Sequence, residues 1–100
     1  SVIIYMKKDL QTFSNEMMKL VQEKELDYLF TGEGGKVLSS STMLQIILQM
    51  KGHDLIWKKL NGSLLKQQEA MIEVKEYLTL NGYPVAFESE GRFLYMIINK

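Results

Sequence analysis

The pattern of apolar positions is clearest in residues 63–98, where a long amphipathic helix, an abrupt stop and a β-hairpin follow one another. Apolar residues recur at helical spacing with charged and amide side chains between them, and they are Leu64, Leu65, Met71, Ile72, Val74 and Leu78. Ser63 precedes the stripe and suits the N-cap position. The pattern predicts one half-buried helix.

The stop consists of Asn81, Gly82, Tyr83 and Pro84. Asn and Gly adopt the left-handed conformation that ends a helix, and proline cannot continue one. Beyond it, apolar residues alternate with others on both sides of residues 89–91, which predicts two strands. Gly91 suits the left-handed position of a three-residue hairpin loop.

The first third of the chain gives weaker signals. Residues 2–6 are β-branched and aromatic and predict a short strand, after which Asp9 is the expected N-cap of a first helix. The apolar face of that helix consists of Leu10, Phe13, Met17, Leu20 and Val21. Residues 26–31 either extend it or form a strand; we favour a helix to about Leu29 and a short strand at residues 36–38.

The middle of the chain predicts two further helices. Residues 39–42 offer several N-caps for an apolar helix over residues 43–50, and Gly52 interrupts it. A short helix over residues 55–60 follows, with inward-facing Leu55, Ile56, Trp57 and Leu60. The expected fold is one α+β domain over residues 1–100. It has a helical core of three to four helices and a C-terminal β-hairpin, and residues 2–6 are available to join the sheet.

Composition places the chain among ordinary globular domains. Its 100 residues are 46% hydrophobic, and no apolar run approaches the ~20 residues that span a bilayer. It contains no cysteine and no basic leader followed by an apolar stretch, so we expect an intracellular protein, in the cytoplasm, nucleoid or nucleus, and no membrane association. The formal net charge is zero, but residues 31–68 carry five lysines against two acids.

The order of the predicted elements resembles the winged helix-turn-helix family. The resemblance covers roughly residues 40–98 and is carried by the helix that ends at residues 76–85 and by the hairpin around residues 89–92. It implies a DNA-binding regulator of transcription or replication that acts as a homodimer. In such proteins the last helix enters the major groove and the hairpin tip contacts phosphates or the minor groove.

Residues 57–68 fit that role because they contain three lysines and several amides or hydroxyls but no acid. Lysine suits phosphate oxygens, asparagine and glutamine can pair with adenine, and arginine suits a narrow minor groove. The candidate nucleic-acid-binding residues are therefore Lys58, Lys59, Asn61, Ser63, Lys66, Gln67 and Arg92. Against this, Glu88 and Glu90 flank the arginine, and further acids follow on the helix.

Catalytic and metal chemistry find little support. A single histidine without cysteine does not make a zinc site, and His53 beside Asp54 has no marked nucleophile. Residues 32–36 are glycine-rich but lack the spacing of a phosphate-binding loop. We expect no enzyme, cofactor or small-molecule ligand.

The alternative is a protein–protein interaction module without nucleic-acid contact, for example a small inhibitor or adaptor of the phage or viral kind. Seven methionines and several aromatic residues supply adaptable apolar groups for such a surface. Under either hypothesis a protein partner or a homodimer is expected. Double-stranded DNA is a partner under the first alone.

Overall fold

The computed structural model describes residues 2–30, 36–91 and 93–98, with residues 2–4 described by their backbone. The elements in chain order are α1 (Val2–Gln22), a 3₁₀ turn (Asp27–Leu29), β1 (Lys36–Ser39), α2 (Ser40–Gln49), α3 (Asp54–Leu60), α4 (Leu64–Leu80), β2 (Val85–Glu90) and β3 (Phe93–Ile98). This confirms the expected α+β class, with a helical core and a C-terminal hairpin.

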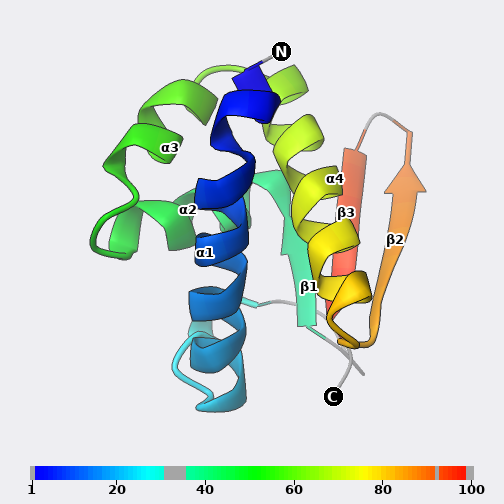
Figure 1. The fold of residues 1–100 in the computed structure, drawn as a ribbon. Helices are drawn as coiled ribbons and strands as arrows, with labels where there is room; N and C mark the ends of the chain where they lie inside the picture. The colour runs from blue at the N-terminus through cyan, green and yellow to red at the C-terminus, as the bar shows by residue number, and fades with distance from the viewer. Residues whose placement is uncertain (1, 31–35, 92, 99–100) are drawn as a thin grey trace.

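The three strands form one antiparallel sheet in the order β1-β3-β2. The register pairs Leu38 of β1 with Met96 of β3, and Phe87 of β2 with the same Met96. Helix α4 packs between α1 and the sheet, and α2 and α3 also pack against α4, with α3 contacting α1 and α2 contacting β1 (Figure 1). The core lies where these layers meet.

The expected N-terminal strand is wrong, because residues 2–6 belong to α1. Met6 and Leu10 are buried together with Phe13 and Met17, so the helical spacing of one continuous stripe overrides the β propensity of the first residues. Asp9 therefore lies exposed inside the helix and is not its N-cap. The third strand of the sheet is β1, which agrees with the short strand that the sequence predicted at residues 36–38.

Helix α1 also ends earlier than Leu29. The amide of Lys24 donates to Val21 O and the amide of Glu25 to Leu20 O, the hydrogen-bond pattern of a Schellman motif. Lys24 occupies its left-handed position with φ of +62°. The chain then turns through the 3₁₀ segment.

The stop after α4 agrees with the prediction. Ser63 caps α4 at its start, and Gly82 has the left-handed φ of +82° just after its end. The hairpin differs in one detail: Glu90 pairs with Phe93, so the connection has two residues instead of three. Gly91 adopts the expected positive φ of +61°.

The methionines fill the core. Six of the seven are buried, and Met50 packs against the cluster from its edge. Interior methionine fills irregular gaps between helices and sheet. The methionines therefore do not form the exposed apolar surface that the protein-interaction hypothesis expected of them.

Candidate functional site

Helices α3 and α4 form a helix-turn-helix. Residues 61–63 connect them, with Gly62 at a φ of +81°, and a short glycine-containing turn is typical of this motif. The Oγ of Ser63 accepts from the amide of Lys66 at 3.3 Å. Across the turn, Nε2 of Gln67 donates to the carbonyl of Leu60 at 2.9 Å. These bonds fix the start of α4 relative to α3.

The predicted nucleic-acid-binding residues divide into three groups. Lys58, Lys59 and Asn61 are exposed at the end of α3, as the prediction needs. Ser63 and Lys66 are half-buried, and Gln67 is buried with its amide engaged, so the structure gives it a role in the helix-turn-helix itself. Arg92 lies outside the described residues.

A groove of about 680 Å³ brings the start of α4 and the hairpin together. Its walls come from residues 39–41 at the start of α2, from Leu64 of α4, and from residues 93–95 of β3. The resemblance to winged helix-turn-helix proteins implies that the start of the last helix and the hairpin tip would contact DNA, and residues of both line this groove. Strand β1 ends opposite Tyr95, so Phe93 and Leu94 border the groove without a β1 partner.

Leu64, Phe93 and Leu94 form an apolar part of the groove lining, beside the polar residues 39–41, Gln67 and Glu90. Leu64 is 47% exposed, and Leu65 and Phe93 are each 67% exposed. The sequence placed the two leucines in the buried stripe of α4, but the buried face consists of Gln67, Ala70, Met71, Val74 and Leu78. Leu65 lies on the opposite side of the helix from this face, whereas Leu64 is in phase with Met71 and Leu78 but is the first residue of the helix. Leu55 of α3 is likewise 69% exposed instead of facing inward.

The outward side of α4 combines apolar and acidic residues. Leu65, Ile72 and Glu76 are exposed there at intervals of seven and four residues, which places them on one side of the helix. The ammonium of Lys75 lies 5.7 Å from the centroid of the Phe87 ring, so this lysine extends toward the sheet. The outward side of α4 thus lacks the basic character of a helix that enters a DNA groove.

The hairpin is acidic in its described part. Glu88 and Glu90 are exposed, and the hydroxyl of Tyr95 donates to Oε2 of Glu88 at 2.9 Å. This hydrogen bond, together with desolvation and the negative charges of Glu88 and Glu90, raises the pKa of Tyr95 above its ordinary value.

Charge therefore changes sign across one end of the molecule. The end of α3 carries the exposed Lys58 and Lys59, the start of α4 presents Leu64 and Leu65, and the hairpin presents Phe93, Glu88 and Glu90. In Figure 1 these three parts lie at the upper end of the fold, with the start of α4 between α3 and the hairpin. We call these seven residues the α4–hairpin face; Glu88, Glu90 and Phe93 contribute to it from the side of the sheet that points away from α4, because the alternate residue Phe87 packs on the core and against Lys75 of α4.

His53 has a structural environment. It is buried at the N-cap position of α3, its Nε2 lies 2.6 Å from Oε2 of Glu16, and its ring meets Phe13 edge-on at 5.7 Å. Among the described residues, no three His, Cys, Asp or Glu side chains gather as metal ligands. The contacts of His53 with Glu16 and Phe13 join α3 to α1 across the core.

Helices of the described part are all too short or too polar to cross a membrane. Searches with protein-family models, among curated proteins and among solved structures find no match to this chain. Its function must therefore be argued from the geometry given above.

Proposed function

We propose that this domain is a protein-interaction module whose α4–hairpin face pairs with a second copy of the chain. The observation that carries the proposal is the exposure of Leu64 and Phe93 at one groove, with Leu65 exposed next to Leu64 on α4. Contiguous exposed apolar side chains with polar residues at their rim are typical of protein interfaces.

The distribution of charge favours a second copy of the chain as the occupant. A two-fold axis through the apolar centre would set the basic end of each protomer, Lys58 and Lys59, against the acidic end of the other, Glu88 and Glu90. Both ends are then satisfied in one closed interface. Such complementary charges fix orientation and speed association, while the apolar centre supplies most of the affinity.

A charge-exchange experiment tests this pairing. One variant carries Lys58→Glu and Lys59→Glu, and the other carries Glu88→Lys and Glu90→Lys. Each alone places like charges at both contacts of the dimer, so sedimentation velocity should show weaker self-association than the unaltered protein. Mixing the two variants makes both contacts attractive again and should restore a dimer that contains one copy of each.

Two controls separate this outcome from damage to the fold. Circular dichroism should be unchanged in both variants, because all four side chains are exposed. The variant Leu65→Ser should dissociate the dimer at high salt, where exposed charges are screened but apolar contacts persist. A monomer at all concentrations, or a mixture no more associated than its components, contradicts the proposal.

DNA binding is the second candidate, favoured by the helix-turn-helix and by the exposed Lys58, Lys59 and Asn61 beside its turn. If it is correct, Lys58→Ala with Lys59→Ala weakens binding to every duplex and lowers the salt slope by about two. Amide shifts during titration with an AT-rich duplex at low salt supply the measurement. No shifts at low salt exclude this candidate, because phosphate attraction is strongest there.

A further inference from the structure

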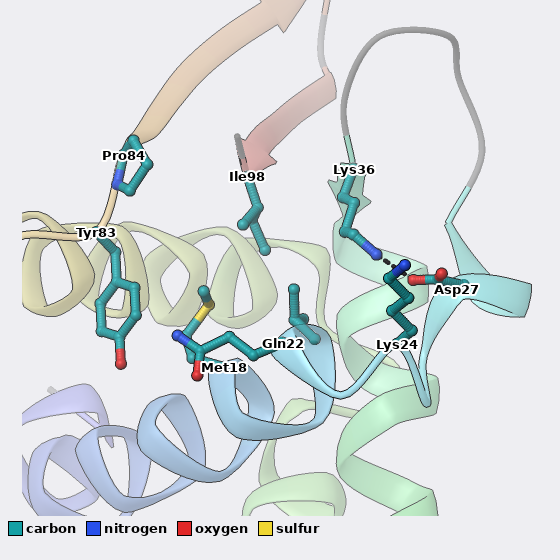
Figure 2. A pocket seen from close by; sticks show the side chains of 9 residues that line it. Met18, Gln22, Lys24, Asp27, Lys36, Tyr83, Pro84 and Ile98 are labelled. Atoms are coloured by element: carbon teal, nitrogen blue, oxygen red, sulfur yellow. Dashed lines mark hydrogen bonds and ion pairs between the residues drawn. The ribbon is translucent and has the colours of Figure 1, made fainter. Parts of the chain in front are cut away.

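A second cavity, of about 430 Å³, lies where the end of α1 meets the other end of the sheet. Figure 2 shows its two unlike halves. Met18, Tyr83 and Ile98 provide apolar walls, whereas Lys24, Asp27 and Lys36 gather on the opposite side. Its volume falls within the range of small-molecule sites.

The polar half carries an excess of positive charge. The ammonium of Lys36 binds the Asp27 carboxylate and lies 5.5 Å from the centroid of the Phe30 ring. Asp27 is thus occupied by one lysine. In the part of the chain that the structure describes, Lys24 has no ion pair, although it lines the same cavity.

The backbone of Lys24 is in a strained conformation beside this cavity. A non-glycine residue at φ of +62° is strained by its Cβ, and glycine is the usual residue at this position of a Schellman motif. Helix α4 ends with the same motif and has Gly82 in it. Strain of this kind is concentrated at functional sites, so a strained lysine beside a cavity suggests a binding role for its side chain.

We propose that this cavity binds a small amphipathic carboxylate, with the carboxylate at Lys24 and the apolar body between Met18, Tyr83 and Ile98. An anion is favoured because Asp27 is already paired and Lys24 is not. The cavity is separate from the α4–hairpin face, so this proposal stands or fails independently of the proposed function.

Octanoate is a suitable probe, titrated by calorimetry and by amide spectra. Shifts are expected at the cavity-lining residues Met18, Val21, Lys24, Tyr83 and Ile98. Octylammonium has the same chain with the opposite charge, and acetate has the same head without the chain. Both should bind much more weakly than octanoate.

The variant Lys24→Gly separates binding from stability. It removes the ammonium and relieves the backbone, so the protein should melt at a higher temperature while octanoate affinity falls roughly 10-fold, the size of one charge-assisted hydrogen bond. Lys24→Arg should keep most of the affinity. Lys8→Ala, an exposed lysine of α1 outside the cavity lining, is the matched control and should leave affinity unchanged.

Three outcomes overturn the proposal. Octanoate produces no shifts at the cavity, octylammonium binds as well as octanoate, or Lys24→Gly leaves the affinity for octanoate unchanged. In the last case the lysine is only a strained helix end.

Discussion

Substitution of Gly82 by alanine tests how the fold ends α4 before the hairpin. The amide of Gly82 donates to Thr79 O at 3.1 Å and the amide of Tyr83 to Leu78 O at 3.0 Å, with Gly82 at φ of +82°. A Cβ at this position would meet no heavy atom within 4 Å. The substitution therefore isolates the backbone cost of a left-handed alanine, about 1 kcal/mol.

Urea denaturation followed by circular dichroism measures this cost. A domain of this size has an m-value of about 1 kcal/mol/M, so the unfolding midpoint of Gly82→Ala should fall by about 1 M with an unchanged slope. Asparagine tolerates the left-handed region, whereas valine is β-branched. Gly82→Asn should therefore cost less than alanine, and Gly82→Val should cost more.

The same reasoning predicts the opposite sign at the end of α1. Lys24→Gly introduces glycine where the strained residue now is, so the free energy of unfolding should rise by about 1 kcal/mol. The account of both helix ends is refuted if the two substitutions change stability in the same direction, or if alanine and asparagine at position 82 are as stable as glycine.

Other measurements address the site itself. Ser63→Ala removes the side-chain cap of α4 and should cost about 1 kcal/mol in urea denaturation, and Ser63→Asp should retain most of that stability. Gln67→Leu keeps the buried volume but loses the hydrogen bond across the helix-turn-helix, a loss of about 1 kcal/mol. Glu88→Gln should lower the pKa of Tyr95, followed by phenolate absorbance. The pKa of Tyr95 is raised in the folded state, so the contact with Glu88 stabilises the fold at pH values below the ordinary tyrosine pKa. This stabilisation is lost as the pH rises through the raised pKa. An unchanged titration of Tyr95 in Glu88→Gln would contradict this account.

Local signals explain why the C-terminal half could be predicted. Three features of this half each depend on a few neighbouring residues. They are the helix cap at Ser63, the helix stop at Gly82 and Pro84, and the alternation of apolar residues through the hairpin. The strand at Lys36 was predictable for the same reason, because a glycine-rich stretch and a row of N-caps bound it.

Tertiary contacts decided what the sequence could not. Residues 2–6 have a high β propensity, yet Met6 packs in register with the buried stripe of α1. The rotation of α4 that exposes Leu65 is set by helix α1 and the sheet, which come from distant parts of the chain. Lys24 gave no signal, because lysine is rare at left-handed positions and nothing local marks such an exception.

The strand order has a consequence for synthesis. Strand β3 follows every other element along the chain but occupies the centre of the sheet, so both β1 and β2 obtain their hydrogen-bonding partner from it. On the ribosome, β1 emerges early and then waits, with its backbone groups unpaired, until residues 93–98 leave the exit tunnel. The helices can associate before that time, but the side of α4 that the sheet covers stays open to solvent. The nascent chain is thus exposed to aggregation until its last strand arrives, and the sheet closes in a single late step.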